Sequence, residues 1–164
     1  MPGPASFEGQ VTVPVQIGAG DVAGIQVLAV AMNPVASYRA FLGAAMARLG
    51  KNPSRVEVRS ATLRLLPTST GATKLADVLT GDVVVSFAMG APTLYDVASV
   101  RSPAAAGPVL FQVRFVPGSV ASVDMSHLCS GYLDVYLGGT LADGFDQAIS
   151  SARLEVALDL VAVE

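Results

Sequence analysis

Alternation of apolar and polar residues predicts most of the regular structure in this chain. Residues 11–17 place Val or Ile at every second position, which is the pattern of a half-buried β-strand. Residues 132–137 and 152–163 alternate in the same way. Residues 24–32 are almost continuously apolar, as expected of a strand buried on both faces. Four further strands are predicted at 56–65, 82–88, 109–115 and 120–125.

One segment follows a helical period instead. Its apolar residues recur every three or four positions and form one face of a helix over about 35–49: Val35, Tyr38, Phe41, Leu42, Ala45, Met46 and Leu49. Asn33 suits the N-cap, Pro34 the first helical position and Gly50 the C-terminal cap. A single further turn of helix is predicted within 92–100.

The strand at 56–65 contains a change of phase. Val56 and Val58 share one parity, whereas Ala61 and Leu63 share the other. An extra residue near Arg59 restores all four side chains to one face, so we expect a β-bulge there.

These elements predict an all-β protein with one helix between its second and third strands. The 164 residues fit one domain, 1–164, in which residues 1–9 form a flexible N-terminal arm. Eight strands interrupted by a helix at that point favour an eight-stranded jelly-roll β-sandwich.

The composition suggests a surface that other copies cover. Hydrophobic residues make up 52% of the chain and charged residues 14%, against about 25% charged in ordinary domains. Either the protein is a very apolar monomer, or identical neighbours hide much of its outside. We favour the second explanation, because large exposed apolar patches usually mark interfaces.

Charge is distributed unevenly along the sequence. The net charge is -3, yet one segment is basic with only Glu57 opposing it: Arg39, Arg48, Lys51, Arg55, Arg59 and Arg64. The C-terminal part is acidic: Asp124, Asp134, Asp143, Asp146, Glu155, Asp159 and Glu164. Scattered charge at sheet edges explains this arrangement, and so does a basic side that meets an acidic neighbour or nucleic acid.

Catalytic and ligand-binding patterns are sparse. His127 and Cys129 could share the face of a strand near Asp124, but plain structural roles are the favoured interpretation. Asp143 and Asp146 lie in a Gly-rich loop and could hold a cation such as Ca²⁺, although a solvated turn is favoured. We expect no catalytic residues, no cofactor and no enzymatic activity.

Membrane insertion and export are not expected either. The longest apolar run, 25–32, is far shorter than the roughly 20 residues that span a bilayer. The first residues lack the basic and apolar regions of a signal peptide. Cys129 is the single cysteine, which suits a reducing compartment.

The order of elements resembles the single jelly-roll coat proteins of small icosahedral positive-strand RNA viruses, and tymovirus-like coats most of all. The residues that carry the resemblance are Met32-Asn33-Pro34 at a strand end, the helix around Ser37-Tyr38-Arg39, and the strand 58–68 running into a Pro-Thr loop. Gly81 to Ala88 followed by Pro92, Gly131 to Tyr136, and 152–163 complete it.

The resemblance implies a capsid protein that self-assembles into an icosahedral shell around a viral genome, in the host cytoplasm. Its partners would be many copies of itself and genomic RNA, contacted through phosphates by the basic residues between Arg39 and Arg64. A strongly basic N-terminal arm is missing, so arm-mediated packaging is not expected. The alternatives are a non-viral β-sandwich module that binds a glycan or protein, and a self-assembling fibre or surface subunit.

Overall fold

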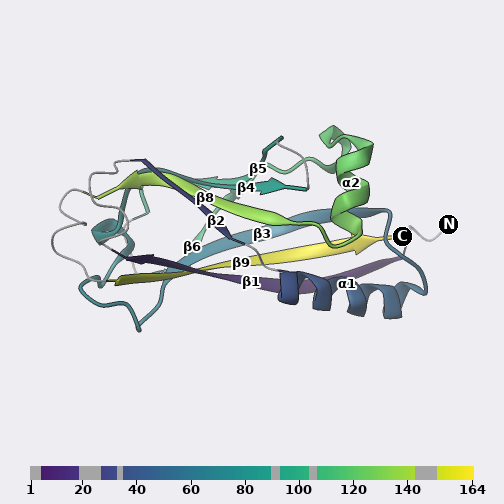
Figure 1. Ribbon diagram of the computed structural model, residues 1–164, viewed down its shortest axis with the longest axis horizontal. Coiled ribbons are helices and arrows are strands. Elements are labelled where there is room, and N and C mark those ends of the chain that lie inside the picture. Colours follow the sequence, from purple (N-terminus) through teal and green to yellow (C-terminus); the bar gives the residue numbers. More distant parts are fainter. Residues whose placement is uncertain (1–4, 19–26, 33–34, 90–92, 104–106, 143–150) are drawn as a thin grey trace.

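The computed structural model describes residues 5–18, 27–32, 35–89, 93–103, 107–142 and 151–164. These residues form two antiparallel sheets packed face to face, with two α-helices at one end (Figure 1). The predicted all-β sandwich is therefore confirmed.

The first sheet has the strand order β1-β9-β3-β6. Its members are β1 (Ser6–Gly18), β9 (Ser151–Val163), β3 (Arg55–Leu65) and β6 (Val109–Leu110). The last strand thus lies between the first and the third, paired along its whole length with β1. This arrangement brings the C-terminal segment beside the basic segment of the sequence.

The second sheet has the order β2-β8-β4-β5-β7. Its members are β2 (Val27–Met32), β8 (Asp134–Leu141), β4 (Leu79–Ala88), β5 (Tyr95–Val100) and β7 (Gln112–Val113). The second strand of the chain therefore pairs with the last strand but one, as the first pairs with the last.

The core lies between the two sheets. Alternate residues of β1 and β9 point inward and are almost completely buried, among them Val11, Val13, Leu154 and Leu158. Period-two patterning predicts this burial, because successive side chains of a strand project to opposite faces. The predicted bulge is confirmed by a shift of register between Val58 and Ser60.

Helix α1 (Val35–Leu49) follows β2 and runs beside the edge strand β1 (Figure 1). The predicted stripe is confirmed at Tyr38, Phe41, Leu42 and Ala45, which are buried, whereas Met46 is 45% exposed. The Phe41 ring packs 5.8 Å from that of Phe7, measured between centroids. The N-cap predicted at Asn33-Pro34 lies outside the described residues.

A glycine permits this close packing of α1 on β1. A Cβ atom at Gly9 would lie 2.8 Å from Cδ2 of Phe41, which is closer than non-bonded carbon atoms approach each other.

Residues 6–9, predicted to belong to a flexible arm, are paired with β9. The first strand therefore starts earlier than predicted, and residues 1–4 lie outside the described part.

Two predicted elements are wrong in type. Helix α2 (Ser122–Cys129) occupies most of the predicted strand 120–125, because Met125, Leu128 and the buried Asp124 follow helical spacing. The turn of helix predicted within 92–100 is strand β5, which pairs with β4 on one side and β7 on the other. In both segments tertiary packing selected between two short patterns that the sequence leaves ambiguous.

The predicted strand 109–115 is divided between the sheets. β6 pairs with β3, and β7 pairs with β5. Between them Phe111 is buried, and its backbone N–H donates to the Ala61 carbonyl over 2.9 Å. The chain crosses from one sheet to the other at this residue and joins them at one edge.

Candidate functional site

Four of the six basic residues singled out in the sequence are neutralised by carboxylates. The side-chain N–O distances are 2.6 Å for Lys51–Glu164, 2.9 Å for Arg55–Glu57, 3.0 Å for Arg59–Glu8 and 3.0 Å for Arg64–Glu155. All four pairs lie at the surface, where such pairs contribute little to stability.

The sheet order explains one of these pairs and a related contact. Because β9 lies between β1 and β3, Glu155 on β9 is directly opposite Arg64 on β3. Asp159 accepts hydrogen bonds from Ser60 Oγ (2.6 Å) and Gln10 Nε2 (3.3 Å) on its two neighbouring strands. The carboxylates that meet the basic segment thus belong to the same molecule: Glu8 on β1, Glu57 on β3, Glu155 on β9, and Glu164 after it.

The C-terminal residue shows the electrostatic effect of this pairing. Lys51 donates a hydrogen bond to the Glu164 carboxylate and places a positive charge beside it, which lowers the pKa of Glu164. The backbone N–H of Glu164 donates to the Ala5 carbonyl. This hydrogen bond holds Ala5 and Glu164, the first and last described residues, next to each other.

Arg39 and Arg48 differ from the other four. Both are exposed on α1, and neither has a carboxylate within ion-pair distance among the residues that the structure describes. Of the predicted nucleic-acid or interface residues, these two therefore retain charge available to a partner.

The residues considered for nucleophilic catalysis lie on α2. His127 Nδ1 is 3.0 Å from the Met89 carbonyl oxygen, and Cys129 is half-buried. Burial raises the pKa of the Cys129 thiol, which disfavours the reactive thiolate. The contact considered for His127 and Cys129 on a strand does not arise, because both residues lie on a helix, where residues two apart do not face each other.

Asp124 has a structural partner. Tyr95 donates its hydroxyl hydrogen to Asp124 Oδ2, and the Ala121 N–H donates to the Tyr95 hydroxyl oxygen. The hydrogen bond to Asp124 is the main cause that raises the pKa of Tyr95. Asp124 is buried, and its Oδ1 atom has no hydrogen-bond partner among the described residues. The hydrogen bonds of Tyr95 to Asp124 and Ala121 connect α2 to β5.

The weak cation-site candidates Asp143 and Asp146 lie outside the described residues. Within the described ranges no three His, Cys, Asp or Glu side chains are close enough together to bind a metal ion. No helix there is long and apolar enough to cross a membrane.

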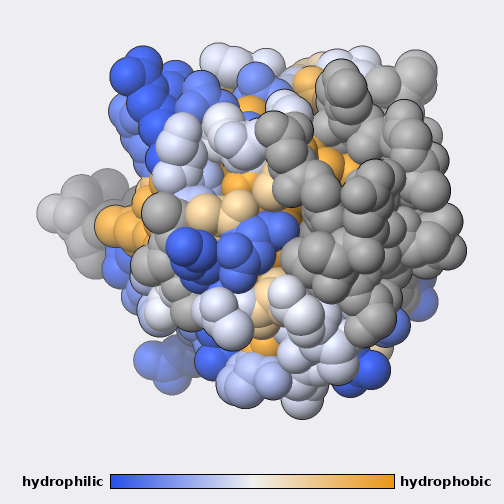
Figure 2. Space-filling view, turned by 90° about the vertical axis from the view of Figure 1, so that its left-hand side faces the viewer, coloured by the Kyte–Doolittle hydropathy of each residue, from blue (hydrophilic) through white to orange (hydrophobic). Residues whose placement is uncertain are grey.

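Most large apolar side chains are in the core, contrary to the expectation of a widely apolar exterior. Among the described residues six are exposed: Met46, Leu94, Leu110, Val116, Val123 and Tyr132. Leu94, Val116, Val123 and Tyr132 belong to segments that border α2, and Met46 is on α1. At the opposite end of the sandwich, hydrophobic and hydrophilic side chains are interspersed in the part of the surface that is not drawn in grey (Figure 2).

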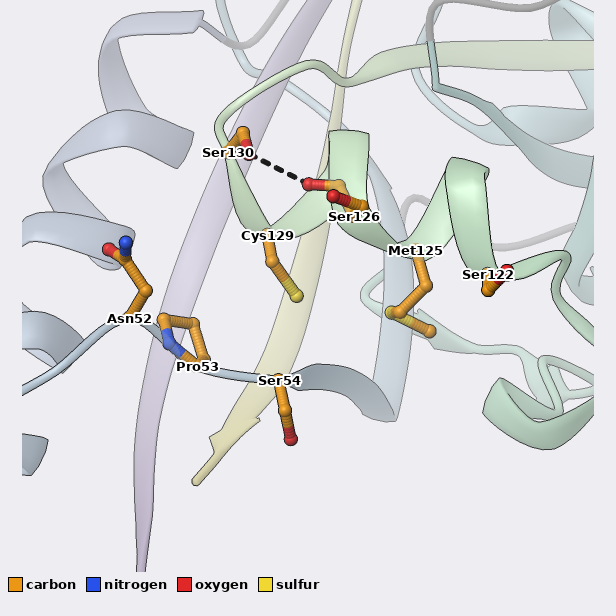
Figure 3. A pocket seen from close by; sticks show the side chains of 8 residues that line it. All are labelled: Asn52, Pro53, Ser54, Ser122, Met125, Ser126, Cys129 and Ser130. Carbon is orange, nitrogen blue, oxygen red and sulfur yellow. Dashed lines mark hydrogen bonds between the residues drawn. The ribbon is translucent and has the colours of Figure 1, made fainter.

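Two surface depressions are relevant to function. One, of about 360 Å³, separates α2 from the start of β3 and is lined mainly by small polar side chains (Figure 3). Cys129 points into it, toward Ser54, while the Ser130 hydroxyl donates to the Ser126 carbonyl over 2.8 Å. The other, of about 310 Å³, is lined by Arg101 and Arg114. Sequence reasoning missed these two arginines, because only strand pairing brings them together.

The chain was compared with family models, curated proteins and solved structures. No family model and no curated protein matches the chain. A solved chain of turnip yellow mosaic virus overlaps 99% of this chain and 95% of its own length, with 11% sequence identity and a TM-score of 0.35. An overlap at that TM-score carries no argument about this chain.

Proposed function

We propose that this protein is a structural coat subunit, which assembles with identical copies into a closed icosahedral shell around a viral genome. In this proposal the shell forms in the host cytoplasm and becomes the virion. The observation that carries the proposal is the strand order of the two sheets, together with the helix between the second and third strands.

The strand order supports a jelly roll. β1 lies beside β9 and β2 beside β8, while β3 and β4 occupy the other sides of those same two strands. Two interleaved Greek keys give this order, and jelly rolls of this kind form viral capsid domains and lectins. β6 and β7 would together be the seventh strand, shared by both sheets. Helix α1 has the position that the coat-protein resemblance implies.

The surface favours self-assembly over glycan binding. Exposed apolar side chains border α2, at the end of the sandwich that carries both helices (Figure 1). Such residues are typical of protein contacts, and many identical contacts close a shell by symmetry. A glycan-binding face would need exposed aromatic rings, and Tyr132 is the one large aromatic exposed in the part of the chain that the structure describes.

Negative-stain electron microscopy with sedimentation velocity tests the proposal. We expect uniform closed particles at high protein concentration in physiological buffer. A monodisperse monomer without particles under those conditions would overturn it, and open filaments would favour the fibre alternative.

Two variants test whether the exposed apolar residues beside α2 form the contacts between copies. Val123→Ser combined with Tyr132→Ser removes apolar contacts beside α2, and we expect a marked loss of particles with an unchanged circular dichroism spectrum. Leu110→Ser removes an apolar side chain that is 67% exposed at another edge. Equal loss of particles in both variants would argue against contacts at the α2 end.

A further inference from the structure

A shallow depression at the edge of the second sheet collects charged and polar side chains from three separate parts of the sequence. It has a volume of about 310 Å³, and Asp82, Ser99, Arg101, Gln112 and Arg114 line it. Neither arginine belongs to the basic segment between Arg39 and Arg64. The depression is therefore independent of the ion pairs on the first sheet.

The pairing of β5 with β7 brings these parts of the sequence together. Ser99 on β5 is directly opposite Gln112 on β7. Arg101 directly follows the end of β5 and Arg114 directly follows the end of β7, so each lies just beyond its strand. Because the strands are antiparallel, the two arginines lie on opposite sides of the Ser99–Gln112 pair, and all four side chains line the one depression.

A hydrogen bond fixes one of the guanidinium groups. Arg114 Nε donates to Ser99 Oγ over 2.7 Å. This contact uses the inner nitrogen of the guanidinium and leaves its two terminal nitrogens to face a ligand. Arginine donors form a planar fork that matches the oxygens of a phosphate.

The charge balance of the depression is positive. Arg101 and Arg114 are opposed by Asp82 alone among the lining residues. In the described ranges neither arginine has a carboxylate within 4.0 Å, in contrast to Arg59 and Arg64. An anion that enters would thus meet two arginines without displacing an ion pair.

We propose that this depression binds a phosphate group between Arg101 and Arg114, with Ser99 and Gln112 contributing polar contacts. The phosphate belongs to a nucleic-acid backbone or is a free phosphate ion, because the two arginines would bind the oxygens of both in the same way. The nucleic-acid source rests on the proposed function, because it would be the genome inside the shell. The site itself is a property of the subunit.

Direct binding to the full chain tests the site. The probes are inorganic pyrophosphate, measured by calorimetry, and a fluorescent oligouridylate of about ten nucleotides, measured by anisotropy. The variant R101Q/R114Q removes both guanidinium groups. The matched control K74Q/R153Q removes the same charge from two exposed side chains that lie outside both the depression and the basic segment, so both variants change the net charge from -3 to -5 (-3 minus 2).

We expect R101Q/R114Q to weaken oligouridylate binding about tenfold or more at low salt, and the control to weaken it much less. Loss of two phosphate contacts to a single strand also reduces the slope of log K against log salt by about 1.4. The variant R101K/R114K keeps the charge but loses the fork, so intermediate binding is expected. Unchanged denaturation midpoints verify that all variants fold.

The outcomes separate the site from the shell. Equal weakening by R101Q/R114Q and K74Q/R153Q, or wild-type binding by R101Q/R114Q, overturns the site. Pyrophosphate that displaces the oligonucleotide supports a nucleic-acid source, whereas pyrophosphate binding without oligonucleotide binding supports free phosphate. Particles without any phosphate binding refute only the site, and phosphate binding without particles refutes only the shell.

Discussion

At the scale of single residues, polar groups in this protein mainly fasten one segment to another. The Tyr38 hydroxyl donates to the Leu128 carbonyl over 2.8 Å, which links α1 to α2. Tyr95 and Asp124 link β5 to α2. Both tyrosines retain their protons more strongly than free tyrosine, since burial raises the pKa of Tyr38 and the bond to Asp124 raises that of Tyr95.

The raised pKa of Tyr38 predicts a loss of stability at alkaline pH. Above the ordinary tyrosine pKa of about 10 the unfolded chain releases the proton while the folded chain keeps it, so stability falls as pH rises. Tyr38 contributes at most about 1.4 kcal/mol per pH unit. Urea denaturation between about pH 9 and about pH 11 measures this slope. We expect Tyr38→Phe to flatten it relative to Tyr132→Phe; equal slopes would contradict the assignment.

The Tyr95–Asp124 contact predicts a second effect. Tyr95→Phe leaves the buried Asp124 carboxylate without its hydroxyl donor, which costs about 1–3 kcal/mol in the free energy of unfolding. The additional variant Asp124→Asn in the Tyr95→Phe background removes the carboxylate charge and should recover part of that loss. Denaturant unfolding of the single and double variants measures both steps. No loss in Tyr95→Phe would show that the contact is dispensable.

At the scale of elements, the crossing segment between the sheets depends on backbone contact. Gly107 precedes β6 and has a φ of 105°. A Cβ atom there would lie 2.7 Å from the Leu63 carbonyl oxygen and 2.8 Å from Arg64 Cα, both on β3. Neither atom can move without displacing the strand, so this position requires glycine.

Gly107→Ala is accordingly predicted to destabilise the protein. Strain from positive φ costs about 1–3 kcal/mol, and the clash with the β3 backbone adds to it. Gly118→Ala is the control, because a Cβ atom at Gly118 meets nothing within 4 Å. Thermal unfolding of the two variants should show a large loss for Gly107→Ala and little change for Gly118→Ala. Similar midpoints would contradict the predicted contact with β3.

At the scale of the whole molecule, the first sheet has a polar outer face and the helical end carries exposed apolar residues. On this sheet the arginines of β3 are paired with carboxylates of β1, β3 itself and β9. The apolar residues beside α2 are Leu94, Val116, Val123 and Tyr132. If copies of the protein associate, apolar contact at the helical end is the expected driving force.

This distribution predicts how assembly responds to temperature. Burial of apolar surface weakens on cooling, so light scattering from assembled particles should rise between about 5 °C and about 25 °C and reverse on cooling. Val123→Ser with Tyr132→Ser should reduce the rise. Assembly that strengthens on cooling would indicate polar contacts and contradict this driving force.

The sequence alone determined the features that depend on local periodicity. Strict alternation identified β1 and β9, and spacing of three and four residues identified α1 within its observed bounds, because backbone geometry fixes both periods. The change of parity at Arg59 located the bulge. The β-sandwich class followed from these elements.

Only the tertiary structure decided features that depend on which segments are neighbours. Residues 95–100 and 122–129 are too short for periodicity to separate strand from helix, and packing settled their type. Strand order joined Arg64 to Glu155 across the sheet, and it brought Arg101 and Arg114 into one depression. Such pairings form between residues far apart in the chain, where no local pattern records them.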